Sequence, residues 1–313
     1  MHNDKRYYDL NTYLRERFGQ RVQKITIDAG FTCPNRDGTR GTGGCIYCNA
    51  RGSGTGASAR GLSIREQLEQ GKQSLQRRYK ARAFIAYFQA FSNTYGSLDR
   101  LRGAYDEALS VDGVVGLSIG TRPDCVDGPT LDLLQSYLAR CMVWVEYGVQ
   151  SMHTPTLERI NRGHGPDVFV DAVTETRRRD IAVCAHLILG LPGESRRDMA
   201  ATARAVAALG VDGVKLHLLY VVRGTPLERL YRAGEYRCMA QDEYVEAVCD
   251  MLERLDPRTV VQRLTGDPHP EELVAPEWSL RKQETLARIH ACLLRRDTRQ
   301  GSRFAGGGSV EPA

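Results

Sequence analysis

The segment VVGLSIGTRPDCVDGPTLDLLQSYLARCMVWVEYGVQS, residues 114–151, contains two apolar stretches separated by a helical pattern. Both ends of the segment run continuously apolar and are rich in Val and Ile, which is typical of strands covered on both faces. In the middle, leucines recur at the spacing of a helix, at Leu131, Leu134 and Leu138. A strand, a helix and a second strand in this order predict a βαβ unit, in which the two strands lie parallel.

The same alternation of strand and helix extends over most of the chain. Further segments with strand character are 24–30, 83–91, 181–190, 213–222 and 259–264, and a last helix is expected near 278–296. Helical patterns of apolar residues lie between the strands. Repeated βαβ units predict an α/β fold with a parallel sheet, which either closes into a full or partial barrel or stays open as a doubly wound sheet.

The predicted strands are followed by loops of polar and glycine residues. The loops after the second to fifth strands read QAFSNTYG, GTRPD, GVQS and GLPGE, and three cysteines follow the first strand. In both architectures the site forms at the carboxyl ends of the strands, so we expect these loops to line it. No Gly-x-Gly-x-x-Gly follows a strand into a helix and no Walker-type lysine loop is present, which argues against a dinucleotide or P-loop site.

The composition is that of a soluble globular protein, with 42% hydrophobic residues and a formal net charge of +5. No stretch approaches the roughly 20 apolar residues of a membrane helix, and the N-terminal MHNDKRYYDL lacks the apolar region of a secretion signal. We therefore expect a cytoplasmic protein without a membrane partner. In a reducing compartment, the nine cysteines are expected to be buried thiols or metal ligands and not disulfides.

Cys33, Cys45 and Cys48 have the spacing C-x11-C-x2-C directly after the first predicted strand. Three thiolates from one loop can hold three corners of an iron-sulfur cluster or of a tetrahedral metal site. On spacing alone, a zinc site, a cluster and unligated thiols all remain open, because C-x2-C serves several metals. The other cysteines form no second C-x2-C, and among them Cys125 follows GTRPD at the expected mouth of the site.

The end of the cysteine motif, CIYC at 45–48, resembles the cluster motif of the radical S-adenosylmethionine (radical SAM) superfamily, which usually has a first spacing of three residues where this chain has eleven. A longer first spacing occurs in the branch that contains the Elongator catalytic subunit. TRPDC at 121–125, GVQS at 148–151 and NRGH at 161–164 look like that branch. DAGFTCPNRDG, YFQAF, GTRPDCV and LVAPEWS resemble the small bacterial proteins of the YhcC or YtqA type, over nearly the whole chain.

The resemblance implies a partial (β/α)6 barrel of the TIM type at 24–265. An N-terminal extension at 1–23 precedes this barrel, and a C-terminal helical extension at 266–300 follows it. The Gly- and Ser-rich tail at 301–313 is expected to be disordered from its composition.

The resemblance also implies the cofactors. A 4Fe-4S cluster is expected on Cys33, Cys45 and Cys48, and S-adenosylmethionine (SAM) is expected to bind the iron that has no cysteine. Reductive cleavage of SAM yields a 5′-deoxyadenosyl radical, so the barrel must exclude water and position one substrate C–H bond.

Several polar residues near the strand ends are candidates for contact with SAM. Glu146 and Gln150 share one face of the fourth strand, and both side chains require partners, either in the cofactor or in an internal hydrogen-bond network. YFQAF stands where the superfamily commonly has Gly-Gly-Glu to hold the SAM amino group. The full set of expected cofactor-binding residues is Tyr47, Gln89, Ala90, Glu146, Gln150, Arg162 and His186.

Three further residues are the candidates for catalysis. Lys215 and His217 are two residues apart in the sixth strand, so their side chains face the same side of the sheet. Such a pair in an apolar segment is difficult to explain by packing alone. Arg122 either forms a local ion pair with Asp124 or meets the substrate, and Arg263, near the end of the last strand, is a further, weaker candidate.

The substrate is also predicted from the resemblance. Members of the Elongator branch act on wobble uridines of tRNA, and the basic segment at 278–303 either contacts a phosphate backbone or forms a solvated helix face. We therefore expect a radical SAM enzyme that modifies RNA, with tRNA and a small electron-donor protein of the flavodoxin or ferredoxin type as partners. Two alternatives are a radical SAM enzyme acting on a small metabolite or a protein side chain, and a zinc-bearing, noncatalytic RNA-binding protein.

Overall fold

The computed structural model describes residues 5–52 and 56–306, and its centre is a seven-stranded parallel sheet. The strands lie in the order β1-β2-β3-β4-β5-β6-β8, and all neighbouring pairs are parallel. Their bounds are Val22–Ile27 (β1), Ala83–Phe88 (β2), Val114–Thr121 (β3), Met142–Gln150 (β4), Ala182–Leu189 (β5), Gly213–Leu218 (β6) and Val260–Arg263 (β8). A second, antiparallel sheet consists of β7 (Val221–Val222) and β9 (Leu273–Ala275).

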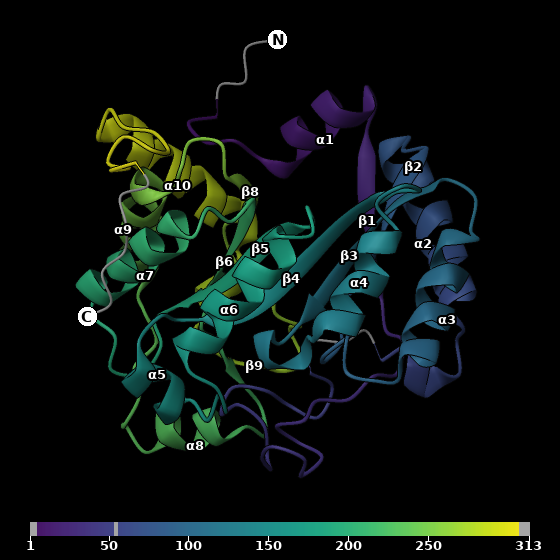
Figure 1. Ribbon diagram of the computed structural model, residues 1–313. Coiled ribbons are helices and arrows are strands. Elements are labelled where there is room, and N and C mark those ends of the chain that lie inside the picture. The colour runs from purple at the N-terminus through teal and green to yellow at the C-terminus, as the bar shows by residue number, and fades with distance from the viewer. Residues whose placement is uncertain (1–4, 53–55, 307–313) are drawn as a thin grey trace.

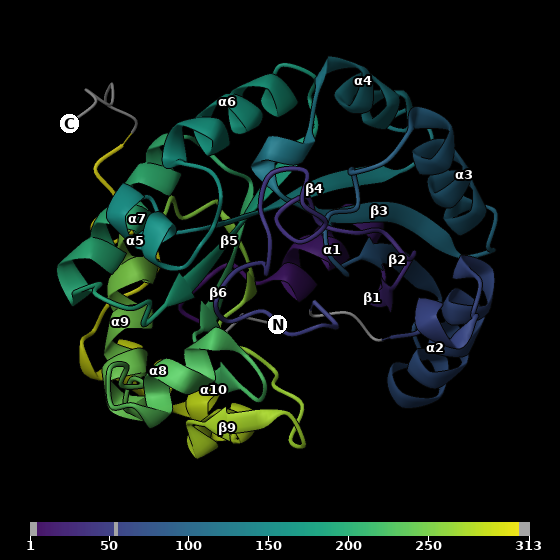
Figure 2. The ribbon, with the colours of Figure 1, turned by 90° about the horizontal axis from the view of Figure 1, so that it is seen from below.

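Ten α-helices surround the large sheet in the part of the chain that the structure describes (Figure 1). They are α1 (Leu10–Phe18), α2 (Ile64–Tyr79), α3 (Leu98–Leu109), α4 (Gly128–Ser136), α5 (Thr154–Arg159), α6 (Pro166–Arg177), α7 (Arg196–Ala208), α8 (Pro226–Arg232), α9 (Gln241–Arg254) and α10 (Lys282–Arg295). Figure 2 shows the strands as an arc with α2, α3, α4, α6 and α7 on its outer side. The inner side of the arc is therefore left to residues of the strands and of the loops that follow them.

The strands follow one another in space in the same order as in the chain. A doubly wound sheet reverses its strand order at a switch point, and this sheet has no such reversal. The structure therefore confirms the partial barrel. Because β1 and β8 are the two ends of the order, the barrel is open along one side, and the N-terminal segment lies beside β8, where the Val261 N–H donates to the Tyr8 carbonyl oxygen at 2.8 Å.

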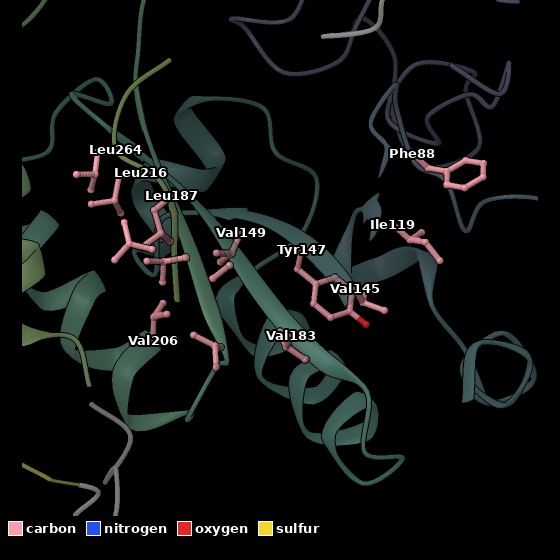
Figure 3. Packing of buried hydrophobic residues seen from close by; sticks show 14 of the residues in the cluster. Phe88, Ile119, Val145, Tyr147, Val149, Val183, Leu187, Val206, Leu216 and Leu264 are labelled. Carbon is pink, nitrogen blue, oxygen red and sulfur yellow. The ribbon is translucent and has the colours of Figure 1, made fainter. Parts of the chain in front are cut away.

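The hydrophobic core lies between the sheet and the outer helices (Figure 3). Val145, Tyr147 and Val149 of β4 belong to it and are fully buried. Because side chains alternate along a strand, Glu146 points to the opposite, inner side of the arc. The inner face of the sheet is thus where polar side chains of the strands come together.

Two predicted elements differ from the structure. The segment 213–222, predicted as one strand, is divided, because β6 ends at Leu218 and β7 leaves the large sheet to pair with β9. The last helix, predicted near 278–296, begins later as α10, after a short 3-10 turn at Glu277–Leu280.

The tail predicted to be disordered is ordered in its first part. The Arg303 N–H donates to the Glu253 carbonyl oxygen at 2.7 Å, and Arg303 Nε is 3.0 Å from the Glu253 carboxylate. These contacts hold this part of the tail against α9, so the prediction of disorder is wrong there, and 307–313 lie outside the described residues. Within the described ranges, no helix is long and apolar enough to span a membrane.

Candidate active site

A cavity of about 270 Å³ lies at the carboxyl ends of the strands. It brings together almost all residues that the sequence singled out. The predicted site residues that line it are Cys33, Cys45, Tyr47, Cys48, Gln89, Arg122, Glu146, Gln150, Arg162, His186, Lys215, His217 and Arg263. Ala90 is the exception, because it is buried after the end of β2 and does not line the cavity.

The CIYC segment is fixed from two sides by hydrogen bonds. The Ile46 N–H donates to the Ile160 carbonyl oxygen at the end of α5 at 3.1 Å, and the Ile46 carbonyl oxygen accepts from the Leu227 N–H of α8 at 2.9 Å. The Asn161 side-chain amide donates to the Gly44 carbonyl oxygen at 2.8 Å. The thiol loop is therefore held in place by elements that are far away in the sequence.

Two donor groups lie beside the thiol of Cys45. Arg162 Nη1 is 3.6 Å from Cys45 Sγ, and Asn35 Nδ2 is 3.9 Å from the same sulfur. Burial and the neighbouring Cys45 thiol raise the pKa of Cys48 to about 11. Metal coordination reverses this preference because it deprotonates the thiol, and N–H donors then stabilise the negative charge on sulfur.

The motif thiols are not arranged around a single ion. A tetrahedral zinc site with Zn–S bonds of about 2.3 Å needs sulfurs about 3.8 Å apart. In the part of the chain that the structure describes, the one group of three or more His, Cys, Asp and Glu ligand atoms within 4.8 Å of one another consists of Glu146, Cys184 and His186, and it includes no motif thiol. The three motif thiols are therefore not gathered closely enough to hold one zinc ion together.

Arg122 forms the local ion pair with Asp124 that the sequence left open. Its Nε and Nη2 each donate to the carboxylate at 2.8 Å, and both side chains are buried. The remaining Nη1 of Arg122 is buried without an acceptor in the described residues, and so is Nε of Arg162. Two guanidinium groups that line the cavity therefore each keep one donor for a ligand.

The end of β4 has an unusual backbone. The register with β5 shifts between Gly148 and Gln150, and Gln150 has a φ of 72°, in the left-handed region that residues other than glycine rarely adopt. Arg162 Nη2 donates to the Gly148 carbonyl oxygen next to this shift. Strained backbone of this kind persists where its surroundings determine it, commonly at functional sites.

Glu146 lies at the floor of the cavity, with its side chain 0% exposed. Lys24 Nζ is 2.5 Å from Oε1 and His186 Nε2 is 2.7 Å from Oε2, and Lys215 and Ser118 also donate to the carboxylate. Burial alone raises the pKa of Glu146, but Lys215, Lys24 and His186 outweigh burial and hold it well below its usual value. Both carboxylate oxygens thus accept hydrogen bonds from protein side chains. Of the two alternatives that the sequence left open for Glu146, the structure shows the internal hydrogen-bond network.

Sequence reasoning missed four members of this network. Lys24 carries the same signal as Lys215, a lysine inside an apolar strand, and could have been found. Tyr87 lies below both lysines, with its ring centroid 3.9 Å from Lys215 Nζ and 5.0 Å from Lys24 Nζ. Gln262 Oε1 accepts from Lys24 Nζ at 2.6 Å, and Ser118 also accepts from it. The tyrosine, the glutamine and the serine carry no signal, because they are ordinary strand residues.

His186 and His217 lie side by side in the cavity, with ring centroids 5.7 Å apart. Burial and the nearby Lys215 lower the pKa of His186 to about 4. Burial and Arg263 lower the pKa of His217 well below its usual value. Both imidazoles are therefore neutral at pH 7, and each can donate one hydrogen bond and accept another.

Comparison with known proteins shows the family. The profile of the Radical SAM superfamily matches residues 36–206, which is more than half of the chain, and the profile of the Radical_SAM C-terminal domain matches 211–295. The chain belongs to the radical SAM superfamily.

Relatives of this radical SAM protein share nearly its whole length. YtqA of Bacillus subtilis is 44% identical over 301 residues, which cover 96% of this chain and 94% of YtqA. YhcC of Escherichia coli K12 is 39% identical over 266 residues, which cover 85% of each chain. The structure of Elp3 from Methanocaldococcus infernus has a TM-score of 0.69 at 16% identity and covers 89% of this chain and 64% of that chain, which supports the barrel fold.

Radical SAM enzymes use a 4Fe-4S cluster and SAM, and the residues of the cavity fit both groups. The three motif thiols line the cavity together with Arg162, whose buried Nε has no acceptor among the described residues and can meet one such as the carboxylate of SAM. Membership of the radical SAM superfamily leaves no support for the zinc-bearing, noncatalytic alternative.

Proposed function

We propose that this radical SAM enzyme holds its cluster on Cys33, Cys45 and Cys48 and modifies RNA, with tRNA as the substrate class. The observation that carries the proposed radical chemistry is that the three motif thiols and the unpaired donors of Arg122 and Arg162 line one cavity. When bound, the cluster and SAM supply a 5′-deoxyadenosyl radical that removes a hydrogen atom from the substrate.

Residues around the thiols stabilise and orient the cofactors. The N–H groups of Arg162 and Asn35 stabilise the Cys45 thiolate, because hydrogen bonds to a charged sulfur are stronger than those to a neutral one. Tyr47, Gln89, Gln150 and Arg162 line the cavity beside the thiols and are the proposed contacts of SAM. Ala90 is left out of this set because it does not line the cavity.

The floor of the cavity has a different role. Because both oxygens of Glu146 are occupied by protein donors, we assign it to positioning Lys215 and His186 and not to direct contact with SAM. Lys215, His217 and the free Nη1 of Arg122 are the proposed contacts of the substrate. Each of these groups carries N–H donors in a buried place, where a polar ligand binds more strongly than in water.

The assignment to RNA rests on the motifs shared with the Elongator branch. The basic segment 278–303 adds less support than its charge predicts, because cations of α10 form ion pairs with α9. Arg288 is 2.8 Å from Asp242, and Arg295 is 2.6 Å from Glu246. The chemistry also needs a one-electron donor, and a flavodoxin- or ferredoxin-type protein in the cytoplasm stays the prediction.

The test compares the modified nucleosides of bulk tRNA from four strains. One strain has the gene and one lacks it. The other two lack the chromosomal gene and carry either a wild-type copy or a Cys48→Ala copy. We expect one modified nucleoside to disappear with the gene and to return with the wild-type copy only. Identical nucleoside profiles in all four strains would contradict the assignment to tRNA and favour a metabolite or protein substrate.

A further inference from the structure

A second cavity of about 430 Å³ lies at the open side of the barrel. It is lined by residues of β1 and β8, of the N-terminal segment with α1, and of the start of α10. Tyr87, Lys215 and Arg263 line both this cavity and the one that contains the thiols. These three residues therefore form a junction between the two cavities.

The junction carries more positive than negative charge. Lys24 and Lys215 share the single carboxylate of Glu146, and Arg263 has no carboxylate within 4.0 Å among the residues that the structure describes. His186 and His217 are neutral at pH 7 because their pKa values are lowered. Three cations thus face one anion in a largely buried place.

The other charged residues of the second cavity do not correct this excess. Lys5 is 2.7 Å from Asp9, and Lys282 is 3.0 Å from Asp267, so each of these lysines has its own carboxylate. Unpaired cations away from water are costly unless an anion compensates them. An anionic ligand at the junction removes that cost.

A buried hydrogen-bond donor points to a ligand independently of the charges. Gln262 lines the second cavity, and its Oε1 is taken by Lys24, but its Nε2 is buried without an acceptor in the described part of the chain. Buried polar atoms in folded proteins nearly always have a partner. The donor beside Arg263 therefore indicates an acceptor that is supplied from outside.

We propose that this junction binds a phosphate group of the substrate, with Arg263 as the principal ligand and Gln262 as a second donor. The proposal rests on the proposed function and narrows its substrate to a phosphorylated molecule or segment. A guanidinium group matches the geometry of phosphate oxygens and can bind two of them. A phosphate also matches an excess of two positive charges better than a single carboxylate does. The phosphate comes either from the RNA backbone or from a small phosphorylated molecule.

The test uses the full chain and calorimetric titration with inorganic phosphate and with uridine 5′-monophosphate. We expect Arg263→Gln to weaken binding of both probes by at least about tenfold, because it removes a charged hydrogen-bond donor, and Arg263→Lys to have an intermediate effect. Lys282→Gln is the matched control, since it removes one charge from the same cavity at a lysine that already has a carboxylate. Equal affinities for the wild type and Arg263→Gln, or an equal loss in Lys282→Gln, overturn the proposal.

A second measurement uses only the wild-type protein, so its result does not depend on whether a variant folds. In ¹³C-lysine NMR spectra of the wild type, phosphate is expected to raise the pKa of Lys24, which burial lowers to about 8. An unchanged Lys24 titration at saturating phosphate also overturns the proposal. Titration with intact tRNA then distinguishes the sources, because a loss of tRNA affinity in Arg263→Gln assigns the phosphate to RNA and an unchanged affinity assigns it to a small substrate.

Failure of the proposed function gives a different result. If the reconstituted wild type forms no 5′-deoxyadenosine from SAM, the radical function fails even where phosphate binds as expected. If 5′-deoxyadenosine forms but phosphate does not bind, only the phosphate site fails.

Discussion

Glu146 is the residue that holds the floor of the cavity together. Its carboxylate accepts from two lysines, a histidine and a serine that come from β1, β6, β5 and β3. A buried charge of this kind is costly to leave without its partner, because the partner then stays buried and uncompensated. The stability of the inner face of the barrel therefore depends on one side chain.

Glu146→Gln is expected to lower the free energy of unfolding by about 3 kcal/mol, since it leaves Lys24 and Lys215 without a counter-charge. The pKa of Lys24 is expected to fall further below about 8, because Glu146 is a group that raises it. Urea unfolding and ¹³C-lysine NMR measure the two effects.

Glu175→Gln is the control, because Glu175 forms its ion pairs on the surface with Arg178 and Arg179. We expect it to change the free energy of unfolding by less than about 1 kcal/mol. A similar decrease in the free energy of unfolding for both variants would show that the buried network contributes no more to stability than a surface ion pair.

The site was predictable residue by residue where chemistry is visible in one segment. Spacing alone singles out the motif thiols and the Lys215–His217 pair as candidates, and the structure places them in one cavity. Lys24 carries the same signal as Lys215, but its contact with Glu146 could not be predicted, and neither could that of Ser118, because these side chains meet only when separate strands curl around the inner face. Such contacts depend on the arrangement of the sheet, which no local pattern contains.

At the scale of the elements, α2 packs closely against β1 on the outer face of the sheet. Gly71 of α2 faces β1, and a Cβ at this position would lie 2.4 Å from Ile25 Cγ2. Gly103 of α3 has no described atom within 4 Å of such a Cβ. The same substitution at these two helical glycines therefore separates packing from helix propensity.

Gly103→Ala is expected to raise the free energy of unfolding by about 0.5–1 kcal/mol, because alanine is the better helix former. Gly71→Ala is expected to lower it by about 1–3 kcal/mol, because the added methyl group pushes α2 away from β1. Urea unfolding of both variants measures the difference, and stabilisation by both would contradict the packing of α2 against β1.

The end of a strand could be predicted where its apolar segment is followed by a polar loop. It could not be predicted where apolar residues continue beyond the strand. Residues 213–222 read as one strand because Leu219 and Tyr220 prolong the apolar pattern, whereas the chain leaves the sheet after Leu218. The partner of β7 is β9, which lies about 50 residues further along the chain, beyond the reach of local patterns.

At the scale of the whole molecule, buried neutral histidines make stability depend on pH. The pKa of His186 is lowered from 6.5 to about 4, so the unfolded chain binds more protons than the folded one between these values. Stability from this group is complete above about pH 6.5 and is lost as the pH falls towards 4. His217 acts in the same direction, because its pKa is also lowered.

The free energy of unfolding is therefore expected to fall by up to about 1.4 kcal/mol per pH unit for each such histidine between pH 6.5 and 4. In His186→Gln, the free energy of unfolding is expected to change less steeply with pH, because one of the two histidines that contribute to the slope is missing. Urea unfolding at several pH values measures both slopes, and equal slopes for the two proteins would mean that His186 is not held neutral.

The central claim is that the motif thiols hold a cluster at which SAM is cleaved. Its most direct test is anaerobic reconstitution of the protein with iron and sulfide, followed by reduction in the presence of SAM. The wild type and Cys141→Ala, whose thiol precedes β4 at the opposite end of the strand, are expected to turn brown and to form 5′-deoxyadenosine. Cys48→Ala is expected to lose both properties while keeping its fold. A colourless wild-type protein that forms no 5′-deoxyadenosine, or a Cys48→Ala variant that still forms it, would contradict the account.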